Sequence, residues 1–148
     1  MKGEMGMKQQ ETAFVLRAGQ VEAALDKNYR QYLTGRLERP QKELDCLEDD
    51  IEVGMSRYDC FTADAPHRHP VATEHVYVLE GEVRVRLLES GQEYRLERGD
   101  FFLLRPGVAY ASKNAAGTRV LFVKAPGGND KQPVEPDPDT AAWLERWD

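Results

Sequence analysis

Residues 66–81 read PHRHPVATEHVYVLEG, and this stretch decides the fold. His67 and His69 are two positions apart, so on an extended chain their side chains point the same way. Glu74 follows, where a second strand can bring its carboxylate back to the same point. Two imidazoles and one carboxylate suit a divalent metal ion such as Fe, Mn, Ni or Zn. A lone His-x-His pair is also compatible with a structural or solvent-facing role.

On both sides of this stretch, apolar and polar residues alternate with the period of half-buried strands. The alternation is clear in IEVGMS (51–56) and EVRVRL (82–87), and FFLL (101–104) and RVLFVK (119–124) read as further strands. Turn residues recur about every 8–12 residues with no long helical period between them. The pattern predicts an all-β antiparallel sandwich or small barrel.

The chain divides into three parts by composition. Residues 1–11 are interpreted as a flexible leader, residues 12–125 as the β-barrel domain, and residues 126–148 as a proline-rich tail with a short helix. Before the first clear strand, the sequence predicts a strand at 12–17, a helical turn at 21–25, an extended piece at 29–33 and a loop or short helix at 35–50.

The tail helix is expected to start at Asp139 or Thr140 and to end at Trp147. Trp143 and Trp147 are four positions apart, so a helix would place both rings on one face. Packing on the core or on a partner subunit is the interpretation we favour for these rings over stacking on a ligand.

Composition excludes several classes of function. The formal net charge of −6 argues against nucleic acid or an anionic membrane surface as a partner. No apolar run approaches the length of a membrane span, and the polar N-terminus does not read as a secretion signal. Cys46 and Cys60 have no metal or redox spacing and read as free thiols. We therefore expect a cytoplasmic protein.

The histidine stretch resembles the first motif of the cupin superfamily, Gly-x5-His-x-His-x(3,4)-Glu-x6-Gly. His67, His69, Glu74 and Gly81 fall on this pattern at the right spacing, whereas Phe61 stands where the leading glycine is expected.

The second cupin motif, Gly-x5-Pro-x-Gly-x2-His-x3-Asn, follows at the expected distance. Gly99, Gly107 and Asn114 match it, Arg105 replaces the proline, and Tyr110 replaces the histidine. The two motifs span residues 61–114.

This resemblance implies a single-domain cupin-type jelly roll or conical β-barrel, commonly a homodimer. It also implies a metal held inside the barrel by three histidines and a glutamate. The superfamily includes enzymes of many classes, sugar-binding modules and storage proteins, so the activity must be argued from the site.

The role of Tyr110 has three possible interpretations. It can coordinate the metal as a phenolate, because a metal ion lowers the pKa of a phenol. It can instead stand beside a three-ligand site of His67, His69 and Glu74 as a hydrogen-bond donor or general acid/base. In the third reading it fills a barrel that no longer binds metal.

Arg57, Ser112 and Asn114 are the candidate ligand-binding residues. Ser112 and Asn114 share a strand face with Tyr110. Arg57 and Tyr58 precede the histidine stretch, and only one of the two can face inward; alternation does not say which.

The leading hypothesis is a metal-binding cupin that holds a small polar metabolite, a sugar or a hydroxy or keto acid, and catalyses isomerisation, epimerisation or elimination. Tyr110 would then move the proton. The alternatives are a non-catalytic ligand-binding or sensor cupin and an Fe(II)-dependent dioxygenase.

Overall fold

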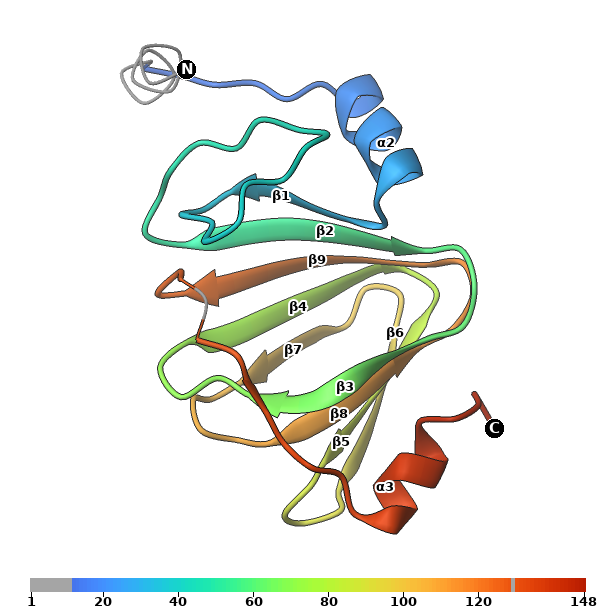
Figure 1. The fold of residues 1–148 in the computed structure, drawn as a ribbon. Coiled ribbons are helices and arrows are strands. Elements are labelled where there is room, and N and C mark those ends of the chain that lie inside the picture. The colour runs from blue at the N-terminus through green and yellow to red at the C-terminus, as the bar shows by residue number, and fades with distance from the viewer. Residues whose placement is uncertain (1–11, 129) are drawn as a thin grey trace.

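The computed structural model describes residues 12–128 and 130–148, and it consists of two five-stranded antiparallel sheets packed face to face (Figure 1). The strand order is β1-β2-β9-β4-β7 in the first sheet and β10-β3-β8-β5-β6 in the second. The leader proposed for residues 1–11 lies outside the described residues. The strands are β1 (Arg30–Thr34), β2 (Glu52–Tyr58), β3 (Thr62–Arg68), β4 (Thr73–Glu80), β5 (Glu82–Leu87), β6 (Glu93–Glu97), β7 (Phe101–Leu104), β8 (Tyr110–Asn114), β9 (Thr118–Ala125) and β10 (Gln132–Pro133).

This arrangement is a jelly roll, the fold that the cupin resemblance implied, and it agrees with the antiparallel sandwich or small barrel predicted from the alternating pattern. The burial of β2 alternates strictly along the strand, with Gly54, Ser56 and Tyr58 on the inner face. Gly81 closes the tight connection from β4 to β5 at φ 81°, a backbone conformation that favours glycine. Inner-face side chains of both sheets form one core: Tyr58, Val78, Val83, Val85, Leu96, Leu104, Tyr110 and Val120.

The strand β3 contains an irregularity that matters for the site. Its register against β8 runs from Thr62 to Asp64, shifts, and resumes where His67 pairs with Tyr110. In a regular strand, Asp64 and His67 would point to opposite faces. The bulge at this shift lets both side chains face the interior, since both line the same cavity.

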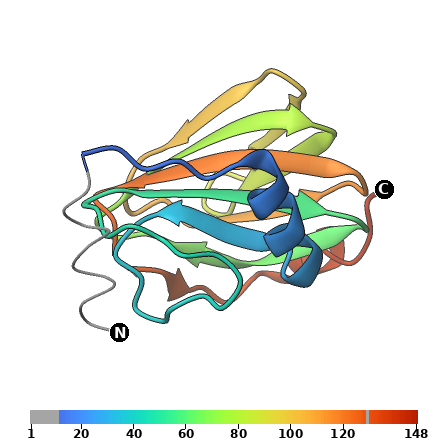
Figure 2. The same ribbon diagram turned by 90° about the horizontal axis from the view of Figure 1, so that it is seen from above.

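The helix α2 (Ala18–Lys27) covers the outer side of the first sheet at the β1 and β2 edge (Figures 1 and 2). It buries Ala24 and Leu25, and the buried Gln31 amide donates to the Ala24 carbonyl. The helix is longer than the predicted turn at 21–25. The strand predicted at 12–17 was wrong: those residues form an irregular segment, with Arg17 as the helix N-cap. The extended piece at 29–33 is confirmed as β1.

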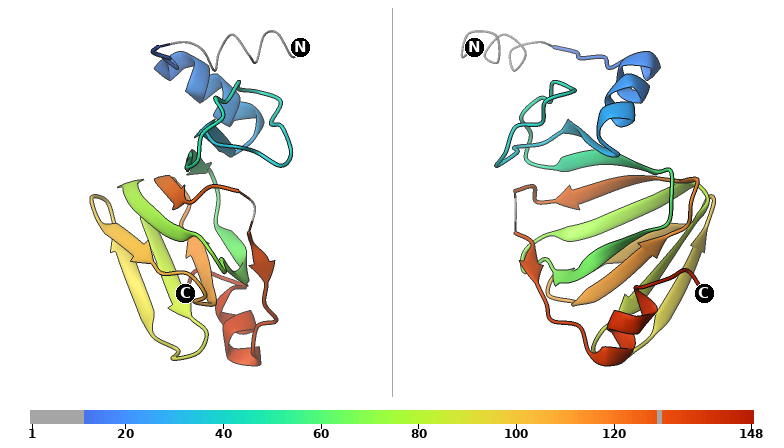
Figure 3. Two further views of the ribbon diagram at one scale, coloured as in Figure 1. Left: turned by 90° about the vertical axis from the view of Figure 1, so that its left-hand side faces the viewer. Right: turned by 45° about the vertical axis from the view of Figure 1, so that its right-hand side comes forward.

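The tail leaves β9, pairs through β10 with the edge of β3, and ends at the opposite end of the molecule from α2 (Figure 3). Its helix α3 (Pro138–Trp143) is capped by Asp137, whose carboxylate accepts from the Thr140 N–H. The predicted helix boundaries were therefore wrong at both ends: the N-cap is Asp137 rather than Asp139 or Thr140, and the helix ends at Trp143 rather than Trp147.

Both tail tryptophans pack on cations of the outer face of the second sheet. The Arg84 guanidinium lies 4.0 Å from the Trp147 ring centroid, and Lys113 Nζ lies 4.3 Å from that of Trp143. Lys113 also donates to the Trp143 and Arg146 carbonyls. Within the part of the chain that is described, neither helix is long and apolar enough to cross a membrane.

Candidate metal centre

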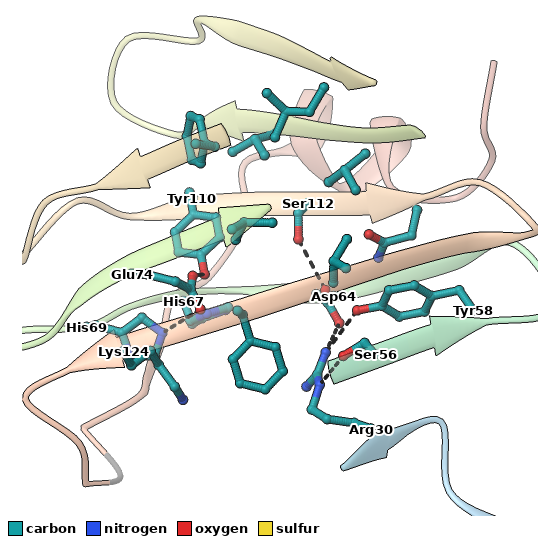
Figure 4. Close-up of a pocket in the computed structure, with 18 of the residues that line it drawn as sticks. Arg30, Ser56, Tyr58, Asp64, His67, His69, Glu74, Tyr110, Ser112 and Lys124 are labelled. Atoms are coloured by element: carbon teal, nitrogen blue, oxygen red, sulfur yellow. Dashed lines mark hydrogen bonds and ion pairs between the residues drawn. The ribbon is translucent and has the colours of Figure 1, made fainter. Parts of the chain in front are cut away.

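A cavity of about 150 Å³ lies between the two sheets. Apolar side chains from both sheets form much of its wall, among them Val76, Val85 and Phe102. Most of the polar side chains that line the rest fall into two groups (Figure 4): His67, His69, Glu74 and Tyr110 form one, and Arg30, Ser56, Tyr58 and Asp64 form the other.

His67, His69 and Glu74 converge at one point of this cavity. One ligand atom from each lies within 4.8 Å of the other two, close enough for a single ion to touch all three. Nε2 of His69 is 4.0 Å from Oε1 of Glu74. Both histidines are buried, at 6% and 4% exposure. The sequence prediction that these three side chains meet inside the barrel agrees with this geometry.

The orientation of the two imidazoles fits a metal ion. Nδ1 of His67 is 2.8 Å from the Ala65 carbonyl oxygen, which can only accept, so Nδ1 carries the hydrogen and Nε2 keeps its lone pair. Nδ1 of His69 is 2.8 Å from Oδ1 of Asp130. Metal-binding histidines are commonly held in this way, with the second ring nitrogen donating to a carbonyl or carboxylate.

Asp130 is itself fixed by backbone groups. Its Oδ2 accepts from the Ala72 N–H at 2.8 Å and the Val71 N–H at 3.0 Å. Burial raises the pKa of Asp130, but these hydrogen bonds and the one from His69 outweigh it and hold that pKa below its ordinary value. The carboxylate is therefore ionised and accepts the His69 hydrogen. Sequence reasoning missed Asp130 because it lies in the tail, far from both motifs.

The Tyr110 hydroxyl donates a short hydrogen bond to Oε2 of Glu74. Its ring also packs on His67, with centroids 4.6 Å apart. Burial, then the neighbouring Glu74 charge, raises the pKa of Tyr110 well above its ordinary value. The phenol is thus protonated in this arrangement and stands beside the His-His-Glu group.

The protonation state of His67 also suits a ligand role. Burial lowers the pKa of His67, against the raising effect of its hydrogen bond to Ala65. The neutral ring is the form that binds metal ions, so this environment favours the form a metal requires.

Of the three residues predicted to bind ligand, two lie in the cavity and one does not. Ser112 and Asn114 line it, and both are buried. Arg57 is on the outer face of β2, where it pairs with Glu22 and Asp26 of α2 at 3.3 and 2.7 Å. The inward position belongs to Tyr58, because the alternation of β2 places even-numbered residues inside.

The second polar group of the cavity was not found from the sequence. Arg30 enters from β1, and Asp64 faces inward only because of the bulge in β3. Ser112 donates to Asp64 at 3.2 Å, which links this group to the strand that carries Tyr110 (Figure 4). No period in the sequence marks a bulge, although Pro66 inside the strand is a hint that pairing is interrupted.

Comparisons with known proteins agree with this geometry. Residues 61–124 match the family model of the cupin domain. Germin-like protein subfamily 2 member 1 of Arabidopsis thaliana is 36% identical over 69 residues, 43% of this chain and 32% of the relative. Germin-like protein 5-1 of Oryza sativa subsp. japonica is 31% identical over 80 residues, 51% of this chain and 36% of the relative. The chain thus spans about a third of the length of these curated relatives.

A solved structure of an uncharacterized conserved protein with a double-stranded β-helix domain from Klebsiella pneumoniae subsp. pneumoniae has a similar fold. Its TM-score is 0.56 at 20% identity, covering 85% of this chain and 99% of that one. The two-sheet fold, the matched domain over residues 61–124 and the germin-like relatives together support a cupin domain in this chain.

Proposed function

We propose that the protein binds a divalent metal ion through His67, His69 and Glu74 and holds a small polar metabolite beside it in the barrel. The observation that carries this proposal is the anchoring of both imidazoles through Nδ1, which leaves both Nε2 atoms for the site. A largely buried carboxylate next to two imidazoles is costly unless a cation compensates it.

A bound ion of this kind polarises a carbonyl or hydroxyl oxygen of the ligand. Tyr110 would supply the proton transfer, because its hydroxyl lies in the cavity, carries a proton and is oriented by Glu74. Val76 and Phe102 give part of the same cavity an apolar wall, and Tyr110 itself is only 6% exposed. These parts fit isomerisation, epimerisation or elimination of a sugar or of a hydroxy or keto acid.

Metal titration of matched histidine variants tests the metal site. The wild type should bind Mn(II) or Zn(II) stoichiometrically in equilibrium dialysis with elemental analysis, and His67→Ala or His69→Ala should abolish tight binding. His75→Ala is the control, because His75 contacts the Val123 carbonyl away from the cavity. A wild type that stays metal-free after reconstitution, or a His75 variant as defective as the other two, would overturn the proposal.

Tyr110→Phe tests the proton-transfer role. In deuterium oxide, the metal-loaded wild type should catalyse exchange of the substrate hydrogen next to the carbonyl group for deuterium. The exchange is measured as the loss of that hydrogen's proton NMR signal from the acid or sugar. The variant should keep its metal and slow the exchange by roughly 10²–10⁴-fold, the usual contribution of a general acid or base. A visible phenolate band in an Fe(III)-loaded wild type that the variant lacks would instead show that Tyr110 coordinates.

A non-catalytic ligand-binding cupin is the second candidate. The hydrogen bond from Tyr110 to Glu74 favours it. Tyr110 stands where the cupin motif has its third histidine, the fourth ligand, and its hydroxyl donates to one oxygen of Glu74. Metabolite binding without exchange in the wild type would select this candidate over the enzyme.

A further inference from the structure

Arg30 is a cation inside the barrel that belongs to neither cupin motif. It is opposite Ser56 in the β1–β2 register, and its side chain lines the cavity. Its Nε donates to Ser56 Oγ at 3.0 Å and its Nη2 to the Tyr58 hydroxyl at 3.0 Å (Figure 4). Two neutral hydroxyls thus hold the guanidinium in one orientation without neutralising its charge.

The nearest anion neutralises Arg30 only in part. Oδ1 of Asp64 is 3.6 Å from Nη2, longer than a hydrogen bond, and Oδ2 of Asp64 accepts from Ser112. Nη1 of Arg30 has no hydrogen bond or ion pair with any residue in 12–128 or 130–148. The Arg30 side chain keeps 28% of its surface exposed. Because it lines the cavity, unused donors of the guanidinium are available there to a ligand.

With a divalent ion bound, the charges of the cavity would be short of negative charge. Lys124 also lines the cavity, but its charge is paired with Glu52 at 3.1 Å. Lys131 lines the cavity, is exposed at its mouth, and has no ion pair with a described residue. Arg30 and Lys131 together balance Asp64 and Glu74, so a divalent ion on the histidines would give the cavity an excess of two positive charges.

We propose that Arg30 anchors a carboxylate of the ligand, so that the ligand class is small carboxylic acids with a hydroxyl or carbonyl oxygen that reaches the His67, His69 and Glu74 group. This inference rests on the proposed function for the metal end only. Planar guanidinium groups bind carboxylates through two parallel hydrogen bonds, and a preoriented one loses little conformational entropy on binding. Lys131 at the mouth adds attraction for the anion before it enters.

The competing explanation is that Arg30 and Asp64 form an ion pair that only supports the barrel. The two explanations differ in what Asp64 does to an incoming carboxylate. If Arg30 anchors the ligand, Asp64 competes with it, and Asp64→Asn should tighten the binding of acids. If the pair is only structural, any gain of acid affinity in Asp64→Asn comes from the general loss of negative charge, and it should persist when Arg30→Gln is added.

The experiment compares acids with neutral analogues of nearly the same shape, L-lactate with propane-1,2-diol and D-gluconate with D-glucitol. Isothermal titration calorimetry is run on the full chain, once dialysed against chelator and once loaded with Mn(II), with the metal content of each sample measured. The wild type should prefer the acid in each pair. Arg30→Gln should lose roughly ten- to a hundredfold of that preference, the usual effect of a charge-assisted hydrogen bond.

Arg57→Gln is the matched control, since it makes the same change on the adjacent strand but on the outer face. It should leave the preference unchanged. A preference that survives in Arg30→Gln, with normal thermal stability, overturns the inference. A wild type that binds no metal but still prefers acids through Arg30 overturns the proposed metal function and supports the carboxylate anchor.

Discussion

At the scale of single residues, the imidazoles are oriented by groups from two different parts of the chain. His67 is held by a carbonyl two residues before it on the same strand, and His69 by Asp130 in the tail. The first contact comes with the local strand geometry, whereas the second depends on a segment more than fifty residues away. Of the proposed metal ligands, His69 is therefore the one whose orientation a tail substitution can disturb.

Asp130→Asn should weaken metal binding by about 10–100-fold, the usual cost of losing the partner of a metal-binding histidine. The amide keeps the size of the side chain but is a weaker acceptor for the His69 hydrogen and loses the charge that polarises the ring. Competition with a chromophoric chelator measures the affinity. Glu135→Gln is the control, because it removes the same charge from an exposed tail residue. Equal affinities for the two variants would contradict a supporting role for Asp130.

Site residues placed by regular strand geometry could be predicted from the sequence. Those placed by a bulge or by contacts between distant segments could not. His67, His69 and Glu74 meet because strand alternation and one strand reversal are regular, and the cupin motifs describe that regularity. Asp64 could not be predicted, because the bulge between Asp64 and His67 changes which sheet face its side chain lies on relative to His67. Arg30 and Asp130 could not be predicted, because only the pairing of β1 with β2 brings Arg30 to the cavity and only the path of the tail brings Asp130 to His69.

At the scale of elements, β2 and β9 pack around a glycine. Gly54 pairs with Phe122 across the sheet and faces the interior, and a Cβ at this position would overlap the Phe122 ring. Phe122 also lines the cavity. The absence of a side chain at position 54 therefore makes room for the Phe122 ring, which forms an aromatic part of the cavity wall.

Gly54→Ala should lower the free energy of unfolding by about 1–3 kcal/mol, the usual cost of overpacking a filled core. Urea denaturation measures it. Gly19→Ala in α2 is the same substitution where nothing lies within 4 Å, and it should instead stabilise the protein by about 0.5–1 kcal/mol. If Phe122→Leu does not relieve the cost of Gly54→Ala in the double variant, the overlap is not its cause.

The helix α2 is held on the sheet by ion pairs of Glu22. Its carboxylate binds Arg119 at 2.6 and 2.8 Å and Arg57 at 3.3 Å. These contacts, the hydrogen bond from Arg119 foremost, lower the pKa of Glu22 below its ordinary value. A carboxyl group whose pKa is lower in the folded state stabilises that state above its unfolded-state pKa and loses the effect as pH falls through the folded-state pKa.

Glu22→Gln should therefore be less stable than the wild type at pH 7, by a few tenths to about 1 kcal/mol because the pair is partly exposed. The difference should vanish as the pH falls below the lowered pKa of Glu22. Urea denaturation from pH 7 down to the acid limit of folding gives both values. Glu89→Gln, an exposed residue of the β5–β6 turn, serves as control. A pH-independent difference for Glu22→Gln would show that charge is not involved.

At the scale of the whole molecule, the two sheets were predictable and the two ends were not. Alternation at 51–56 and 82–87 fixed which faces are buried, and the glycine turns set the strand order along the chain. The irregular segment at 12–17 and the early stop of α3 depend on tertiary packing: α2 docks through Glu22, and Lys113 holds the last carbonyls of the tail helix. The helix and strand propensities of a local segment contain no information about such tertiary contacts.

The outer face of the first sheet supports a proposed homodimer. Phe101 and Tyr77 are 60% and 42% exposed there, and Leu103 is 37% exposed. They lie on β7 and β4, and β7 is the last strand of its sheet, so its free edge and these side chains form one continuous surface. A two-fold axis would let a second copy cover both the edge and the apolar side chains, which a soluble protein otherwise has to protect.

We expect a dimer at micromolar concentration in sedimentation velocity, and Phe101→Lys should shift it to a monomer because a charge would be buried at the interface. Val15→Lys is the matched control, since Val15 is also exposed, at 59%, but lies before α2 and not on this face. It should remain dimeric. If the wild type sediments as a monomer, the exposed face of β4 and β7 serves another purpose; if both variants dissociate, the dimer forms through a surface that involves the N-terminal segment.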